Sequence, residues 1–218
     1  MNYYTISASD DPKTIGNYPQ TEGRLAFNPT VAHSFTQVFW DEFPDFDPLF
    51  EINLSKKAQP TNFINRSPLS FGFLVDEAFL SILESHRMPP FKAYPVKVFQ
   101  NEEALPYYWF HFIFDMWHYL NAEASQVNEI RKVGYKVIQS HSFGSPSDLK
   151  ALKKGLNFEK GLLLKEAVFR PETKNFDLIE ITDQFYIPLI SERLKDALEK
   201  ANMTGFGTKS FDRISVES

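Results

Sequence analysis

The chain has 218 residues, a formal net charge of −5, and 43% hydrophobic and 16% aromatic residues. This length suits one large domain or two small ones, and 22 phenylalanines supply apolar area for a sizeable core. The absence of cysteine excludes disulfides, thiolate nucleophiles and zinc sites with sulfur ligands. The negative net charge argues against a nucleic-acid partner, because nucleic-acid-binding proteins are usually basic with a concentrated positive face.

The sequence predicts a soluble, cytoplasmic protein with no membrane partner. Its first residues lack the basic and apolar segments of a signal peptide. Apolar runs are too short to cross a bilayer, and histidine and aspartate interrupt the richest stretch, residues 107–119. The lack of cysteine also fits a reducing compartment.

Residues 1–68 are predicted to form an N-terminal arm with an acidic aromatic segment, and residues 69–218 an α+β body. Turn signals at residues 10–12 and 28–29, with few apolar anchors, predict an irregular course for residues 1–35. Such an arm is expected to lie over the body or to fray.

Residues 38–52 interleave aromatic and acidic side chains, and Pro44 and Pro48 prevent a long helix there. Three interpretations are open. In the first, the segment presents an acidic aromatic surface to a basic protein partner. In the second, its acids bind Ca²⁺, although the spacing lacks the glycine turn and the final bidentate glutamate of an EF-hand. In the third, its aromatic side chains pack into the core and its acids stay in water. The first interpretation predicts the partner-binding residues Trp40, Asp41, Glu42, Asp45 and Asp47.

The body contains two segments, residues 74–91 and 189–206, that align without a gap. Each pattern predicts the end of a strand, an amphipathic helix, and a turn into an extended segment. Asp76 is the expected N-cap of the first helix, and an acid in each first turn favours the helix N-terminus. The sequence therefore predicts an α+β fold of two related strand–helix–strand units with a central antiparallel or mixed sheet. The matching pairs are Leu74 and Leu189, Glu77 and Glu192, Leu83 and Leu198, Glu84 and Glu199, Met88 and Met203, and Phe91 and Phe206.

Further strands are predicted between the two segments. Residues 92–99 form a strand, and Pro95 places it at a sheet edge or gives it an irregular start. Residues 107–119 are apolar on both faces, which indicates a central strand covered on both sides. Residues 127–139 form two short strands or one long strand bent at Gly134.

The region before the second segment begins with a predicted helix. Ser145 and Pro146 indicate its start, and Gly155 lies near its end. The apolar runs 161–169 and 176–181 are separated by a short turn, which predicts a β-hairpin.

The chain lacks the nucleophile elbow, P-loop, dinucleotide and zinc-protease motifs. On a helix, the spacing of His111, Asp115 and His118 would place all three on one face, as a metal triad requires. On a strand, which the pattern favours, His118 lies on the opposite face. The sequence Ser140-His141-Ser142 predicts a polar loop, because a nucleophile and its base are assembled from distant positions. No catalytic residue, metal or cofactor is predicted.

One group of short motifs resembles a known family. The motifs are Val168-Phe169-Arg170, Ile190-Ser191-Glu192, Leu194-Lys195-Asp196-Ala197 and Thr204-Gly205-Phe206. They resemble a bacterial family, formerly of unknown function, that is proposed to contain immunity proteins of polymorphic toxin systems. The resemblance covers roughly residues 70–210. Typical members have more glycine or aspartate at the positions of Asn121-Ala122-Glu123.

The resemblance implies a non-enzymatic protein that binds and neutralises a cognate toxin made by the same cell. No catalytic residues carry over from that family. The alternative function is a metal-dependent hydrolase that uses His111, Asp115 and His118. A third interpretation is a structural or regulatory partner in a larger assembly.

Overall fold

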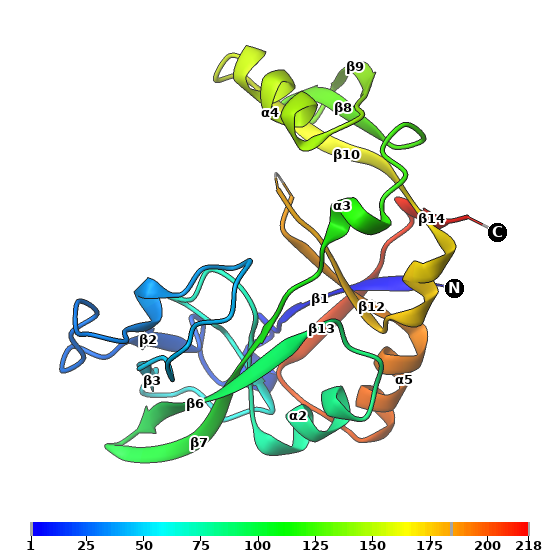
Figure 1. The fold of residues 1–218 in the computed structure, drawn as a ribbon. Coiled ribbons are helices and arrows are strands. Elements are labelled where there is room, and N and C mark those ends of the chain that lie inside the picture. Colours follow the sequence, from blue (N-terminus) through cyan, green and yellow to red (C-terminus); the bar gives the residue numbers. More distant parts are fainter. Residues whose placement is uncertain (1, 184, 218) are drawn as a thin grey trace. The chain divides into compact units, whose positions relative to one another are not determined.

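The computed structural model describes residues 2–183 and 185–217 (Figure 1). Within these residues the fold is mixed and mostly sheet, with five α-helices and fourteen strands in three sheets. The chain divides into two compact units. Unit 1 comprises Met1–Thr5, Phe114–Glu192 and Lys209–Ser218, and unit 2 comprises Ile6–Ile113 and Arg193–Thr208. These boundaries differ from the predicted division at residue 68.

Residues 1–35 are more regular than predicted. They contain strand β1 (Tyr3–Ala8), helix α1 (Pro12–Ile15) and strand β2 (Thr21–Gly23), and the 3-10 helix η1 (Phe35–Gln37) follows. Tyr3, Ile6 and Ile15 are buried. The prediction of an irregular course holds for residues 24–34, which contain no helix or strand, and fails for residues 3–23. There, single buried apolar residues anchor short elements that neighbouring strands cover.

Unit 2 is built on a six-stranded mixed sheet. The order of its strands is β2-β3-β6-β7-β5-β4, where β3 and β6 are parallel and the other pairs are antiparallel. β6 and β7 form a long hairpin that turns at Asn101 and Glu102, both with positive φ. The remaining strands are β3 (Glu51–Leu54), β4 (Phe63–Ile64), β5 (Phe73–Val75), β6 (Phe91–Gln100) and β7 (Glu103–Phe112).

Strand β6 contains Pro95 although it lies inside this sheet and not at its edge. The pairing with β3 covers only Lys97 and its neighbours Val98 and Phe99. Pro95 pairs with Tyr108 of β7 on the other side. A proline lacks the N–H that a second neighbour would require, so this half of β6 behaves as an edge.

The aromatic segment 107–119 divides into two elements. β7 ends at Phe112, and helix α3 (Met116–Tyr119) follows. The prediction of a central strand covered on both faces holds within β7, where Trp109 and Phe110 point to opposite faces and both are buried. It fails beyond Phe112 because Asp115 accepts a hydrogen bond from the N–H of His118 and starts the helix.

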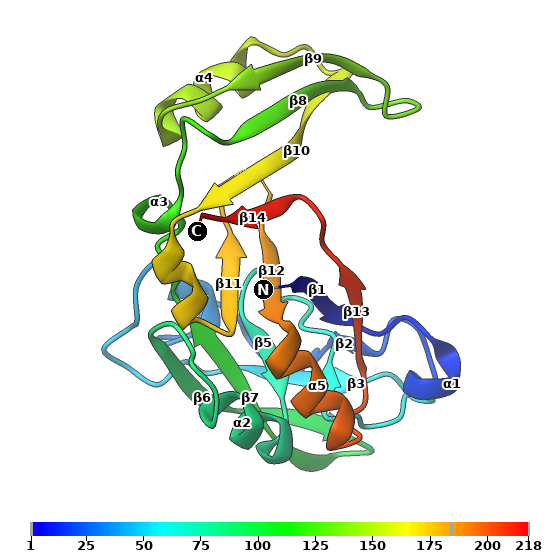
Figure 2. The same ribbon diagram turned by 90° about the vertical axis from the view of Figure 1, so that its right-hand side faces the viewer.

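The two aligned segments each contain a strand, a helix and a strand. The first comprises β5, helix α2 (Glu77–Glu84) and β6, and Asp76 caps α2 by accepting from the N–H of Phe79 at 2.9 Å, as predicted. The second comprises β12 (Ile187–Ser191), helix α5 (Glu192–Lys200) and β13 (Phe206–Ser210). In each case another strand separates the two flanking strands: β7 lies between β5 and β6, and β1 lies between β12 and β13 (Figure 2).

The turn after α5 requires glycine. Gly205 has φ +86°, and a Cβ atom at this position would lie 2.0 Å from the carbonyl oxygen of Phe63. The preceding Thr204 donates to the side-chain oxygen of Asn62 through both its N–H, at 2.8 Å, and its hydroxyl, at 2.9 Å. This close approach explains the Thr-Gly-Phe motif as a structural requirement.

Two four-stranded sheets account for the strands of unit 1, although β1 and β13 continue into unit 2. Their orders are β11-β12-β1-β13 and β14-β10-β8-β9. The predicted helix is α4 (Pro146–Gly155), capped by the Ser145 side chain, which accepts from the N–H of Asp148. The remaining strands are β8 (Gln126–Arg131), β9 (Val137–Ser142), β10 (Lys160–Phe169), β11 (Leu178–Ile181) and β14 (Ile214–Val216).

The predicted hairpin of β10 and β11 does not form. β10 pairs with β8 and β14, while β11 pairs with β12 in the other sheet. The 3-10 helix η2 (Pro171–Asn175) connects the two strands. Between β8 and β9 the first of the two predictions is correct, since the chain forms two strands. None of the helices within residues 2–183 and 185–217 is long and apolar enough to cross a membrane.

Candidate protein-binding surface

Residues 38–50, here called the acidic loop, connect η1 to β3 in unit 2 and are fixed at both ends. Val38 and Phe50 are buried. An isolated β-bridge between Ser34, just before the loop, and Leu49, near its end, brings the two ends of the loop together. The N–H of Phe35 donates to the carbonyl of Leu49 at 3.0 Å, and the N–H of Leu49 donates to the carbonyl of His33 at 2.7 Å.

Side chains from β6 and β7 hold the middle of the acidic loop. The Nε2 of His111, on β7, lies 3.1 Å from the carbonyl oxygen of Trp40. The Phe43 ring packs edge-on against His111, with 5.0 Å between ring centroids. Lys92, on β6, donates to the carbonyl of Pro44 at 3.2 Å and lies 5.8 Å from the Phe43 ring centre. The loop is therefore irregular in backbone but tied to the sheet.

The surroundings of the His111 imidazole disfavour its charged form. The side chain is fully buried and stacks against Trp109. Burial is the main cause that lowers its pKa, and the Lys92 charge acts in the same direction, against the opposing effects of the Trp40 carbonyl and Asp41. The bond to Trp40 assigns the ring proton to Nε2, which leaves Nδ1 as a buried acceptor with no partner in the described part of the chain.

The predicted partner-binding residues are exposed on this loop. Asp41, Glu42, Asp45 and Asp47 are exposed, and within residues 2–183 and 185–217 their side chains form no ion pair or hydrogen bond. Trp40 is 37% exposed, and its neighbour Phe39 is 62% exposed. The alternative expectation was that the aromatic side chains pack inward. It holds for Phe50, which is buried, and in part for Phe43 and Phe46, which are half-buried.

The metal triad is not assembled. His111 belongs to unit 2, while Asp115 and His118 belong to unit 1, where Asp115 caps α3. Among the residues that the structure describes, no three His, Cys, Asp or Glu side chains are placed to hold a metal ion. The acidic loop likewise contains no group of three described carboxylates placed to hold Ca²⁺. The spacing of the triad suited a helix, but His111 is in a strand.

A hollow of about 890 Å³ lies beside the acidic loop. Asp45 and Asp47 of the loop line it together with Glu84, Lys92 and Tyr94. Tyr94 is only 3% exposed, and its hydroxyl has no hydrogen-bond partner in the described residues. Burial, followed by the charge of Asp47, raises the pKa of Tyr94 to about 12. We call this the Tyr94 hollow.

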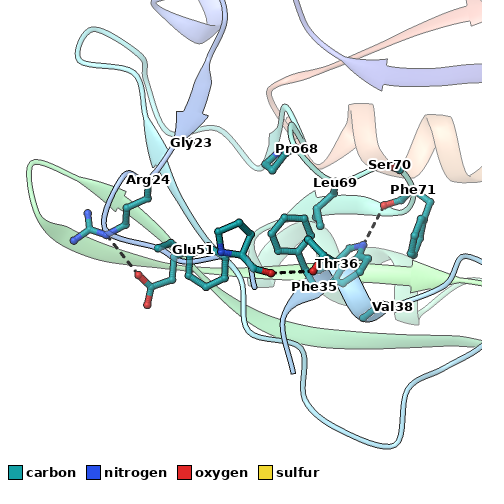
Figure 3. Close-up of a pocket in the computed structure, with 13 residues that line it drawn as sticks. Gly23, Arg24, Phe35, Thr36, Val38, Glu51, Pro68, Leu69, Ser70 and Phe71 are labelled. Carbon is teal, nitrogen blue, oxygen red and sulfur yellow. Dashed lines mark hydrogen bonds and ion pairs between the residues drawn. The ribbon is translucent and has the colours of Figure 1, made fainter. Parts of the chain in front are cut away.

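A second hollow of about 570 Å³ is mainly apolar (Figure 3). Arg24 lies at one end, where it pairs with Glu51 at 3.5 Å and Glu102 at 2.8 Å. The indole N–H of Trp109 donates to the carbonyl of Phe71 at 3.1 Å. The Arg24 guanidinium and the Trp109 indole thus have partners in the chain, but the buried Nε of Arg24 makes no hydrogen bond within the described residues.

Ser140, His141 and Ser142 lie on β9 of unit 1 and not in the predicted loop. His141 Nε2 lies 3.2 Å from Glu129, and Lys160 Nζ lies 2.7 Å from the same carboxylate. The Lys160 and His141 side chains hold the pKa of Glu129 below its usual value. His141 is therefore engaged with an acid, and its contacts do not activate a neighbouring serine.

Sequence patterns did not indicate that Lys92 and His111 support the loop, or that Tyr94 lines a hollow. Each contact joins residues more than forty positions apart, so no local spacing could reveal it. Comparison of the chain with protein-family models finds no matching family, and comparison with curated proteins finds no significant match.

Proposed function

We propose that this protein is a non-enzymatic binding protein that neutralises a cognate bacterial toxin through its acidic loop. The observation that carries the proposal is the set of four exposed, unpaired carboxylates on a loop that the sheet holds in place. Unpaired surface acids attract a basic partner over a distance and set the rate of association.

The exposed aromatic side chains of the loop suit the centre of such an interface. Phe39 and Trp40 project beside the acids. Aromatic residues supply a large share of binding energy when a partner covers them, and the charged rim then selects the partner. The loop backbone is already bonded to His111 and Lys92, so less conformational entropy is lost on binding.

Charge complementarity indicates the kind of toxin. A toxin that acts on nucleic acid carries a basic surface for phosphate, and an acidic loop suits that surface. A protein with this role acts in the cell that makes the toxin, which fits the cytoplasm. The family-like motifs support the immunity role, although their residues build the scaffold: Leu194 and Leu198 are buried, and Gly205 forms a turn.

We also infer that segments 74–91 and 189–206 derive from one duplicated unit. The support is their common strand–helix–strand course, with one further strand between the flanking strands in each. The positions they share are buried leucines, exposed acids in the first and last helical turns, and half-buried Met and Phe residues after the helix. The acidic loop lies outside both segments, so binding depends on what was added to the scaffold.

Co-expression with a toxin encoded beside this gene tests the proposed function. Cells that make the toxin should grow when the wild-type chain is present. The variant with Lys at positions 41, 42, 45 and 47 should fail to protect them. A matched control reverses four exposed lysines of unit 1, Lys132, Lys150, Lys153 and Lys154, to Glu and should still protect. Failure of the wild-type chain to neutralise any neighbouring toxin would reject the proposal.

A further inference from the structure

Strand β9 forms one edge of the unit 1 sheet β14-β10-β8-β9 (Figure 2). It pairs with β8 on one side only. In an antiparallel pair, alternate residues direct their N–H and C=O groups away from the neighbouring strand. Within the described residues these outward groups of β9 have no hydrogen-bond partner. Water or a strand of another molecule must therefore satisfy them.

The outer edge of β9 lacks most of the features that usually protect an edge strand. Such strands are shielded by proline, lysine, a bulge or a covering segment. Residues 137–142 contain neither proline nor lysine, and all are exposed except His141, which is half-buried. The register with β8 skips Ile138, which forms a bulge. The four residues after the bulge, Gln139–Ser142, pair regularly with β8 and keep a free outer edge.

Apolar side chains are exposed beside this edge. Four of the six residues at positions 133–138 are both apolar and exposed. They are Val133 at 91%, Tyr135 at 72%, Val137 at 50% and Ile138 at 44%. Apolar side chains that are exposed together, and not singly, are typical of interaction sites. A strand that extends beyond the bulge would remove several of them from water.

The charge around β9 is positive. Between Glu129 and Asp148 the chain has no acid but has three exposed bases, Arg131, Lys132 and Lys136. None of these three forms an ion pair with another described residue. The Glu129 carboxylate is already engaged in two ion pairs. A second copy of this chain would bring the same positive hairpin to the edge, whereas an acidic segment would be attracted to it.

We propose that β9 receives an extended, acidic segment of a protein partner, which adds a strand to the sheet. The backbone of the segment bonds to the outer edge of Gln139–Ser142. Its apolar side chains cover Val137 and Ile138, and its acidic side chains lie beside Lys132 and Lys136. In strand addition of this kind, main-chain hydrogen bonds supply affinity and side chains select the partner. This inference goes beyond the proposed function, because the acidic loop belongs to unit 2 and attracts a basic partner.

The test uses two short, end-blocked fluorescent peptides of alternating threonine and valine. One carries two aspartates at its C-terminal end and the other carries them at its N-terminal end. Each is titrated into the full chain at low ionic strength. Only one strand direction places the aspartates beside Lys132 and Lys136, so one peptide should bind about tenfold more tightly. Lys132→Glu/Lys136→Glu should remove this difference, whereas Lys150→Glu/Lys153→Glu, an equal charge change on α4, should keep it.

Methylation of the peptide backbone separates strand addition from attraction of charge. Two versions of the tighter peptide carry N-methyl groups on alternate residues, one version along each edge of the strand. An added strand bonds to β9 through one edge only. One version should therefore bind about tenfold more weakly and the other should bind like the parent peptide. The inference is overturned if both versions bind equally well, if the two aspartate peptides bind equally well, or if neither binds.

Other occupants of the edge are also outcomes that overturn the inference. If the free chain forms a dimer in sedimentation measurements and the peptide prevents it, a second copy covers β9. If a fluorescent oligouridylate binds more tightly than the aspartate peptides, and Lys132→Glu/Lys136→Glu abolishes this, the hairpin binds nucleic acid.

These results are independent of toxin neutralisation. Peptide binding at β9 without protection from a neighbouring toxin would reject the proposed function and keep the strand-addition site. Protection without peptide binding would do the reverse.

Discussion

The acidic loop of unit 2 and the lysine-rich region of unit 1, residues 126–160, both expose charges beside apolar side chains. In the loop the exposed aromatics are Phe39 and Trp40. In the lysine-rich region Tyr135 is 72% exposed and Phe158 is 84% exposed. The two regions differ in the sign of their charge and in the way the backbone that carries the charged side chains is held in place.

The lysine-rich region carries its charges on regular elements. Lys150, Lys153 and Lys154 lie on α4, and charged residues on the outer face of a helix are usual in soluble proteins. Its most buried acid, Glu129, is paired with Lys160 and His141. The acidic loop has no such repeating backbone, and side chains of the sheet bond its carbonyls instead.

This difference teaches that exposed charge alone does not identify a binding surface. A helix satisfies its own backbone groups, so lysines along it need no further explanation. An irregular loop stays in place only if other groups bond it. Here His111 and Lys92 hold the loop while its acids remain unpaired, and that combination favours partner binding over mere solubility.

Reversing the charges of each region should give the largest difference between the two regions in their effect on partner association. Replacing Asp41, Glu42, Asp45 and Asp47 with Lys should slow association with the proposed toxin partner by at least about tenfold at low salt, because steering is lost. The salt dependence of the association rate should weaken as well. Stopped-flow measurements over a range of ionic strengths give both quantities.

The control for this experiment lies in unit 1. Lys132, Lys150, Lys153 and Lys154 are exposed, and changing them to Glu reverses the same number of charges. Association of that variant should be as fast as the wild type or faster. If both variants slow association equally, the two regions share the interface and the comparison breaks down.

Removing one aromatic from each region gives the next largest effect. Trp40→Ala should raise the dissociation constant about tenfold or more, mainly through faster dissociation, since buried tryptophans dominate interfaces. Phe158→Ala is the control, because Phe158 is more exposed in the free protein yet lies in the other region. Surface plasmon resonance resolves the dissociation rates. Equal effects of the two changes would contradict the assignment of the interface to the loop.

Local signals in the sequence predicted several elements correctly. Asp76 and Ser145 mark the starts of α2 and α4, where each side chain caps the helix that follows. Caps act within one turn, so adjacent residues contain the information. The pairing of β10 with β8 instead of β11 could not be predicted in this way, since short apolar runs look alike whichever sheet they join.

The candidate site shows the same division. The exposed acids and Trp40 were predicted from one continuous segment, because prolines and acids together oppose both helix formation and burial. The contact of His111 with the loop, and the position of the Tyr94 hydroxyl, depend on the pairing of β6 with β7 and on the path of the loop across these strands. Those contacts exist only in three dimensions.

Neutralising an acid should have opposite effects on stability in the two regions. Glu129→Gln should lower the unfolding temperature at pH 7, because Lys160 and His141 lose their shared carboxylate. Asp45→Asn should leave that temperature unchanged or raise it, since Asp45 only adds repulsion among unpaired loop acids. Calorimetry on both variants measures this difference.

The pH dependence sharpens this prediction. The folded pKa of Glu129 lies below its value of about 4.5 in the unfolded chain. Its contribution is therefore complete above pH 4.5 and is lost as the pH falls through the folded pKa. The stability gap between the wild type and Glu129→Gln should narrow over that acidic range. A gap that stays constant with pH would show that the carboxylate charge is not the cause.

The smallest effect concerns His111 and the hold on the loop. Because the folded pKa of His111 is below its unfolded value of 6.5, the unfolded chain binds the proton first as the pH falls. The wild type should therefore lose stability from about pH 6.5 down to the folded pKa, and keep it above that range. In His111→Gln this acid-induced loss should be reduced, whatever its stability at pH 7, whereas exposed His118→Gln should retain it. Chemical denaturation at pH 5 and pH 7 measures the change, and equal losses in both variants would mean that His111 does not couple the loop to pH.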